Sequence, residues 1–144
     1  NVKAWLARFP DWDLERRNRI QGFTVLSYTP FHAAGAAGLE VIRMLLAARC
    51  NVNHQDDRGY TALLWACKSE FPAPEVVSEL LKAKANMNAQ LVPHTEYWKA
   101  KFSAAREAMQ FAKASSADVE ISTWEGQTPL MAAVRAGKVK EVRE

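Results

Sequence analysis

The side chains able to bind a metal ion or act as a nucleophile are few in this chain of 144 residues. The three histidines are His32, His54 and His94, and the two cysteines are Cys50 and Cys67. Together they are too few and too scattered to match the ligand spacing of a zinc site or a disulfide framework. The sequence therefore predicts no metal and no cofactor.

Motifs for catalysis are also missing from the sequence. It contains no glycine-rich phosphate loop, no Gly-x-Ser-x-Gly and no His-Glu-x-x-His. Cys67 has no evident base, so a packed, unreactive thiol is the favoured interpretation. The carboxylates Asp56 and Asp57 are explained by a solvated turn. We therefore expect no catalytic residue, no small-molecule substrate and no enzymatic activity.

A recurring run that begins with Thr organises the chain. Thr29-Pro30-Phe31-His32 returns, altered, as Thr61-Ala62-Leu63-Leu64 and Thr128-Pro129-Leu130-Met131, at spacings of 32 and 67 residues. Because 67 is close to twice 33, a further altered copy is expected at Thr95. Thr is a favoured N-cap and Pro a favoured first helical residue, so each run predicts the start of a helix. We place the first start at Thr29, since an earlier one would leave Pro30 inside the helix.

A second helix is predicted after each of the first two runs. Residues 40–46 and 75–81 carry apolar pairs four residues apart, which lie on one face of a helix and must be buried against a neighbour. Asn51-Val52-Asn53 and Asn86-Met87-Asn88 then lead into loops, and Asp13-Leu14-Glu15 fits the same place in a partial unit at the N-terminus. The pattern predicts stacked helix pairs.

The order Thr-Pro-Leu-His, Ala-Ala, Gly, Glu-Val-Val, Leu-Leu and Asn-Val-Asn resembles the ankyrin repeat. The resemblance is closest over residues 27–89 and 123–142, and less close over 1–26 and 90–122. It implies an all-α, ankyrin-type helical-repeat solenoid of about four helix-pair units, each followed by a hairpin-like finger, plus an N-terminal partial unit. The single domain, residues 1–144, then divides into a partial unit 1–26, units 27–58 and 59–92, a degenerate unit 93–125 and an incomplete unit 126–144.

The degenerate unit departs from the family pattern. It lacks the usual glycines, and Ala112-Lys113 replaces the Leu-Leu pair. Nothing in the sequence breaks a helix between Glu96 and Ala114, so one unbroken helix stays open as the alternative to a helix pair.

The family resemblance also implies where a partner binds. In ankyrin repeats the inner helices and the fingers form a concave recognition surface, and in this chain those positions carry an aromatic and basic stripe. Trp is enriched at binding hot spots, although Trp65 and Phe102 could instead fill gaps between irregular units. The predicted partner-binding residues are Arg58, Tyr60, Trp65, Lys68, Lys99, Phe102, Trp124 and Arg135.

The resemblance therefore implies a non-catalytic scaffold that binds another protein on its concave surface. A net charge of +3 is too slight to indicate nucleic acid, and no apolar run reaches the roughly 18 residues that span a bilayer. Reduced thiols indicate the cytoplasm or another reducing intracellular compartment. Both chain ends read as unfinished units, which a longer polypeptide or a covering partner would explain. The alternatives are a structural subunit of a large assembly, or a regulatory module of a longer enzyme or channel.

Overall fold

The computed structural model describes residues 2–32, 35–69, 74–110 and 125–135. Within these ranges the chain forms seven α-helices and no β-strand, which confirms the predicted all-α fold. The helices are α1 (Val2–Arg8), α2 (Val25–His32), α3 (Gly35–Ala47), α4 (Ala62–Lys68), α5 (Pro74–Lys82), α6 (Glu96–Gln110) and α8 (Pro129–Arg135).

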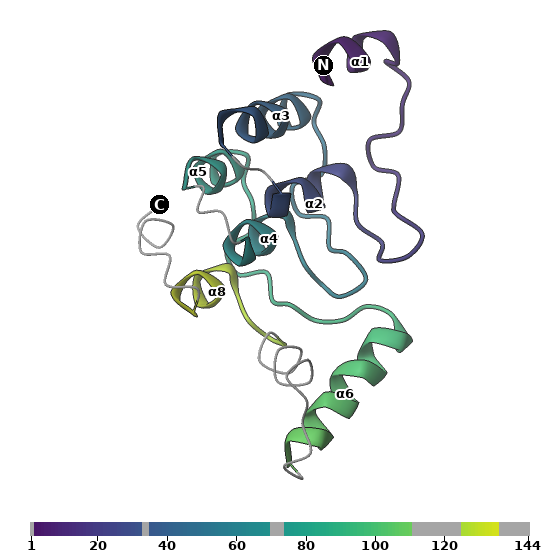
Figure 1. The fold of residues 1–144 in the computed structure, drawn as a ribbon, viewed down its shortest axis with the longest axis vertical. Helices are drawn as coiled ribbons and strands as arrows, with labels where there is room; N and C mark the ends of the chain where they lie inside the picture. Colours follow the sequence, from purple (N-terminus) through teal and green to yellow (C-terminus); the bar gives the residue numbers. More distant parts are fainter. Residues whose placement is uncertain (1, 33–34, 70–73, 111–124, 136–144) are drawn as a thin grey trace.

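Six of these helices lie in two rows, and α6 lies apart from both (Figure 1). In the inner row, α4 contacts α2 on one side and α8 on the other. The outer row consists of α1, α3 and α5, and α3 contacts α5. Contacts of α2 with α3 and of α4 with α5 join the rows into helix pairs. This is the helical-repeat architecture that the sequence predicts.

The first inner helix begins at Val25, so the predicted start at Thr29 is wrong. Thr24 Oγ1 accepts a hydrogen bond from the Ser27 amide at 3.2 Å, and Ser27 Oγ accepts one from the Thr24 amide at 2.9 Å. This reciprocal capping starts the helix upstream of the Thr-Pro step. Pro30 consequently lies inside α2, where it has no amide N–H to donate to the carbonyl of Leu26.

A Gly-aromatic-Thr run therefore marks the start of each of the inner helices α2 and α4. Gly22-Phe23-Thr24 and Gly59-Tyr60-Thr61 stand 37 residues apart, and both glycines have a positive φ, of 70° and 92°. A Cβ on Gly59 would lie 2.3 Å from the carbonyl oxygen of Val92, so the next finger packs directly on this backbone. The predicted unit boundary at residue 27 falls inside α2.

The three other predicted helix starts are confirmed. The hydroxyl oxygens of Thr61, Thr95 and Thr128 each accept a hydrogen bond from the amide three residues further on, at 3.2, 3.4 and 3.4 Å. They cap α4, α6 and α8 respectively. Each cap supplies a partner for an amide that has none within the helix.

In the described part of the degenerate unit, α6 runs unbroken over Glu96–Gln110. This agrees with the single-helix alternative, while residues 111–114 lie outside the described ranges. Phe102 and Ala105 are buried, and Arg106 of α6 forms an ion pair with Glu125 at 3.4 Å. That ion pair links α6 to the segment that precedes α8.

Equivalent loops of successive units are joined by equivalent hydrogen bonds. The Asn51 amide donates to Glu15 Oε1 at 2.7 Å, and the Asn86 amide donates to Asn53 Oδ1 at 2.7 Å. Leu14 packs against the core that the two rows share. Residues 13–15 therefore occupy the place in the N-terminal partial unit that the sequence predicts.

Candidate functional site

Four of the predicted partner-binding residues lie together, on the finger between α3 and α4 and on α4 itself. The rings of Tyr60 and Trp65 stack with centroids 4.3 Å apart. The guanidinium carbon of Arg58 lies 5.4 Å from the Tyr60 centroid and 5.0 Å from the Trp65 centroid. Lys68 Nζ lies 5.3 Å from the Tyr60 centroid and 3.3 Å from its hydroxyl. Two cations therefore rest on one aromatic pair.

The aromatic members of the predicted stripe are buried. Tyr60, Trp65 and Phe102 are each 3% exposed, so the structure does not present their rings on an open concave surface. The rings of Tyr28 and Phe31 on α2 meet Trp65 edge-on, at 5.3 and 4.9 Å. α2 covers this side of α4, and the burial of Trp65 and Phe102 agrees with the alternative that they fill gaps between units. Contact of these three residues with a partner stays a prediction.

The remaining predicted residues lie elsewhere. Lys99 is exposed on α6 and forms an ion pair with Glu96 at 2.8 Å. Arg135 is exposed in the last turn of α8. Trp124 lies outside the described residues, so the structure says nothing of its side chain.

Arg58 has two further partners that the sequence did not indicate. Its guanidinium carbon lies 5.2 Å from the ring centroid of Trp98 on α6, and its Nη2 donates to Gln21 Oε1 at 2.8 Å. Arg58 therefore joins two neighbouring fingers, α4 and α6. The only signal of Trp98 in the sequence is its place three residues after Thr95.

Asp56 is fully buried, which corrects its interpretation as part of a solvated turn. Its Oδ1 accepts the amides of Arg58 and Tyr60 at 2.9 and 3.0 Å, and its Oδ2 accepts the indole N–H of Trp65 at 3.1 Å. Burial raises the pKa of Asp56, while these hydrogen bonds and the Arg58 charge act in the opposite direction. The carboxylate holds the turn closed, which is a structural role.

Backbone hydrogen bonds connect three successive fingers. The Asp57 amide donates to the Gln21 carbonyl at 2.9 Å, and the His94 amide donates to the Asp57 carbonyl at 3.0 Å. Side chains reinforce this ladder: Arg17 forms an ion pair with Asp57 at 2.7 Å, and the His54 ring lies 2.8 Å from the Gly22 carbonyl oxygen. The fingers therefore form one connected platform beside the inner row.

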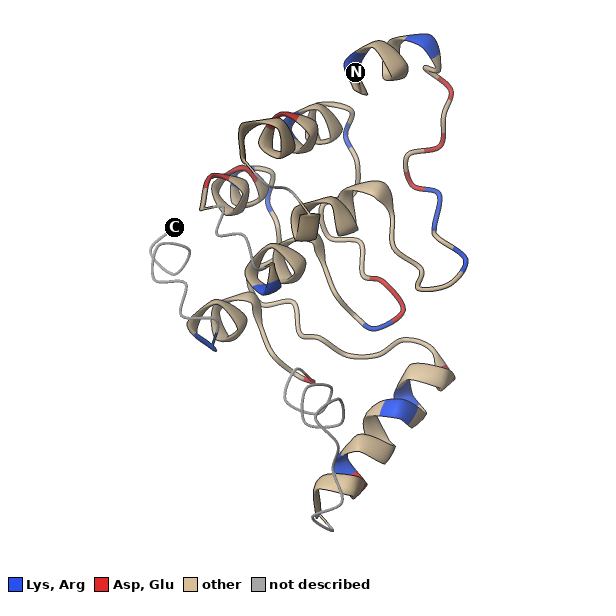
Figure 2. Cartoon of the chain, in the orientation of Figure 1, with Lys and Arg blue, Asp and Glu red and all other residues tan. Residues whose placement is uncertain are grey.

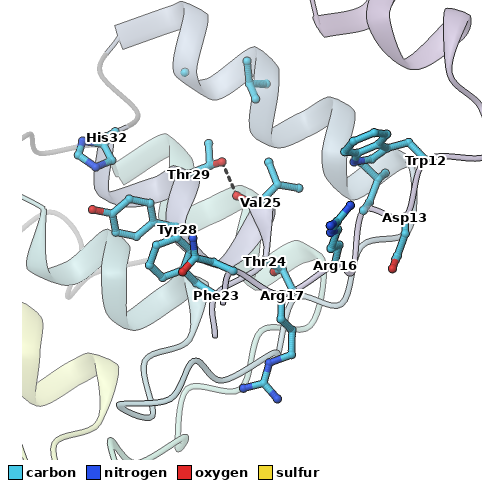
Figure 3. Close-up of a pocket in the computed structure, with 14 residues that line it drawn as sticks. Trp12, Asp13, Arg16, Arg17, Phe23, Thr24, Val25, Tyr28, Thr29 and His32 are labelled. Atoms are coloured by element: carbon cyan, nitrogen blue, oxygen red, sulfur yellow. Dashed lines mark hydrogen bonds between the residues drawn. The ribbon is translucent and has the colours of Figure 1, made fainter. Parts of the chain in front are cut away.

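The described residues hold no group of three or more His, Cys, Asp or Glu side chains placed to share a metal ion. A hollow of about 540 Å³ lies between the first finger, α2 and α3 (Figure 3). Arg16 and Arg17 both line this hollow, and their side chains point in different directions in Figure 3. Apolar and aromatic side chains such as Trp12, Val25 and Tyr28 line the hollow together with polar and charged ones such as Asp13 and Asn18.

Basic side chains mark the C-terminal ends of two inner helices. Lys68 ends α4 and Arg135 ends α8, and neither helix carries an acidic residue in its first turn (Figure 2). Lys and Arg residues also lie along α6 in the same view.

Among the described helices, none is both long and apolar enough to cross a membrane.

Comparisons with known proteins bear on the family of this chain. No curated protein matches the chain. A family model described as ankyrin repeats, in three copies, matches residues 2–91, which is more than half of the sequence. Domains of this kind generally bind other proteins. On these grounds, the chain belongs to the ankyrin repeat family.

Proposed function

We propose that this chain is a non-catalytic protein-binding module that recognises an acidic segment of its partner through the basic side of α4 and α6. The observation that supports this most directly is the placement of Lys68, whose ammonium group lies over the stacked Tyr60 and Trp65 rings. A cation held in one place loses less conformational freedom on binding than a free surface lysine.

The neighbouring finger and helix extend this surface. Arg58 connects the Tyr60 and Trp65 rings to Trp98 on α6. Lys99 is an exposed cation on the same helix. The ladder between fingers supports a preorganised surface, which reduces the ordering cost of binding. The binding site proposed from sequence is thereby narrowed to its polar members, with the buried aromatic residues as their support.

The proposed role holds for a free scaffold, for a fixed subunit of a larger assembly and for a regulatory module of a longer protein. Native mass and the full reading frame distinguish these three. We also propose a reducing intracellular compartment, which the two buried cysteine thiols support.

The test compares two double variants of equal charge. Lys68→Gln with Lys99→Gln removes two cations from the proposed surface, and Lys82→Gln with Lys84→Gln removes two from the outer row. Lys82 pairs with Glu79 three residues away, as Lys99 does with Glu96, so the control loses a similar surface ion pair. Each protein serves as bait in extract of the source cells, and recovered partners are quantified.

We expect the first variant to recover about tenfold less of the main partner, because losing two rim charges costs about 1.4 kcal/mol. The control should match the wild type, and wild-type recovery should fall as salt rises. Equal recovery by both variants would contradict the proposal.

A further inference from the structure

The fingers before α2, α4 and α8, which we call the first, second and third, are each closed by the same pair of backbone hydrogen bonds. In the second finger the Asp56 amide donates to the Tyr60 carbonyl at 3.0 Å, and the Gly59 amide donates to the Asp56 carbonyl at 2.9 Å. In the first finger the amides of Asn18 and Gly22 make the corresponding two bonds, at 2.8 and 2.9 Å. Each of these two tips is therefore a short turn.

The third finger has the same pair of bonds around a much longer stretch of chain. The Leu91 amide donates to the Gln127 carbonyl at 3.0 Å, and the Gly126 amide donates to the Leu91 carbonyl at 2.8 Å. Gly126 has a positive φ, as the glycines at the same place in the first two fingers do. Residues 92–125 therefore stand where residues 57–58 form the tip of the second finger.

The packing of the helices agrees with this register. After the third finger the next member of the inner row is α8, which packs directly against α4. Among the described helices, none packs extensively against α6, and α6 lies apart from both rows in Figure 1. An inner helix of a further repeat would stand between α4 and α8 and would separate them. The direct contact of α4 with α8 leaves α6 outside the stack.

The helix α6 is also less buried than the members of the stack. Six of the seven residues of α4 are buried, whereas Phe102 and Ala105 are the buried residues of the whole of α6. Phe102 packs in one cluster with Tyr60, and the ring of Trp98 lies 5.2 Å from the guanidinium carbon of Arg58. An element with few buried apolar contacts opens at a lower free energy than the core around it.

We propose that residues 92–125 are an insertion in the tip of the third finger and that α6 is a separate unfolding unit, whose loss leaves the inner row of α2, α4 and α8 intact. One consequence rests on the proposed function. Lys68 belongs to the stack, whereas Lys99 is carried on α6 and leaves the binding surface when α6 opens. Docking of α6 therefore strengthens binding of the acidic partner, and the partner in turn shifts α6 toward its docked state.

Hydrogen exchange of the backbone amides tests the separate unit without any partner. Ala104→Pro removes a hydrogen bond in the interior of α6 at an exposed position, and the proline ring clashes with the preceding turn. We expect the amides of α6 to exchange about a hundredfold faster than in the wild type. The amides of α4 and α8 should keep their wild-type rates. Ala104→Gly repeats the test with a smaller change and should accelerate α6 alone, by about fivefold.

Ser78→Pro is the control, because it makes the same change in the interior of α5, a helix of the stack. The amides of α4 and α5 should both exchange faster in this variant, since the two helices pack together. The proposal is overturned if Ala104→Pro accelerates α4, α6 and α8 equally, or if that variant loses its fold. Either result would make α6 a cooperative member of the stack, as a degenerate repeat would be.

The link to the partner has its own readout in the capture experiment described above. Ala104→Pro should recover about threefold less partner than the wild type, as Lys99→Gln alone should, because each removes one of the two cations from the surface. Wild-type recovery by Ala104→Pro, with recovery lost in the double variant of Lys68 and Lys99, would refute the link to α6 and leave the proposed function intact. Wild-type recovery by every variant would refute the proposed function, whereas the exchange experiment would still decide whether α6 is a separate unit.

Discussion

Trp65 donates its indole N–H to the carboxylate of Asp56, with Nε1 and Oδ2 3.1 Å apart. Both residues are buried, and the bond ties the finger to the inner helix that follows it. Asp56 also accepts the amides of Arg58 and Tyr60, so the same carboxylate closes the turn and fixes α4 against it. Trp65, which the sequence predicts as a partner-binding residue, thus joins the finger to α4.

Replacing Trp65 should destabilise the fold. Trp65→Phe keeps most of the ring but leaves Asp56 Oδ2 buried without its donor, which we expect to lower the free energy of unfolding by about 1–3 kcal/mol. Trp65→Ala adds a cavity beneath α2 and should cost about 3–5 kcal/mol. Urea titration followed by circular dichroism measures both. Trp12→Phe, at an exposed tryptophan, should stay within about 0.5 kcal/mol of the wild type. If Trp65→Ala leaves the free energy of unfolding unchanged, Trp65 does not stabilise the fold and this prediction is wrong.

Asp56 should make stability fall as pH rises through the mildly acidic range. Burial raises its pKa above the ordinary value in the folded state, so the folded chain binds more protons than the unfolded chain between the two values. Stability from this group is therefore present below the unfolded pKa and is lost as pH rises through the folded pKa. Urea midpoints of wild type and Asp56→Asn across this range measure the effect, and the variant should lack this part of the slope.

Glu79 should give the free energy of unfolding the opposite pH dependence in the same experiment. Hydrogen bonds from Arg43 and Lys82 lower its pKa, so its contribution is present above the unfolded pKa and is lost as pH falls. Glu79→Gln should remove that loss without affecting the slope due to Asp56. If Asp56→Asn and the wild type show the same pH dependence, the carboxylate is not the titrating group.

Sequence reasoning worked where local chemistry decides the structure. Thr61 caps α4, and the apolar pairs in 40–46 and 75–81 lie on the helices α3 and α5, because caps and apolar periodicity act over a few residues. It failed at Thr29, since the capping partners Thr24 and Ser27 are short polar residues that are equally common in loops.

The candidate site was harder to predict than the fold. Burial of Trp65 depends on Tyr28 and Phe31, which come from a helix more than 30 residues earlier in the chain. The stacking of Arg58 on Trp98 depends on where a separate helix, α6, lies relative to the finger. Neither relation follows from residue spacing, because each is set by the packing of elements that are distant in sequence.

Both cysteines should react slowly with a thiol reagent while the protein is folded. Burial and the nearby Glu15 charge raise the pKa of Cys50 to about 11, so at pH 8 about one molecule in a thousand carries the thiolate. Cys67 is buried between inner helices. With Ellman's reagent we expect a slow phase for two thiols, and an immediate reaction of both in denaturing urea. Rapid reaction of Cys67 in the folded protein would contradict its interpretation as a packed, unreactive thiol.

Glycine should stabilise the two turns that follow α3 and α5. Arg49 and Lys84 follow α3 and α5 with φ of 60° and 65°, a left-handed conformation that side chains with a Cβ disfavour. Both side chains are exposed, and the hydrogen bond from Asn53 Nδ2 at 3.2 Å reaches the backbone carbonyl of Lys84, which a substitution keeps. Arg49→Gly and Lys84→Gly should therefore each raise the free energy of unfolding by up to about 1 kcal/mol.

Glu40→Gly is the control for this pair, because it also replaces an exposed charged residue but lies inside α3. There glycine should lower the free energy of unfolding by about 0.5–1 kcal/mol, since it adds backbone freedom to the unfolded chain without relieving strain. Urea midpoints compare all three variants with the wild type. Opposite signs at the turn and helix positions would tie the gain to the left-handed backbone, whereas destabilisation at all three sites would show that Arg49 and Lys84 bear no strain.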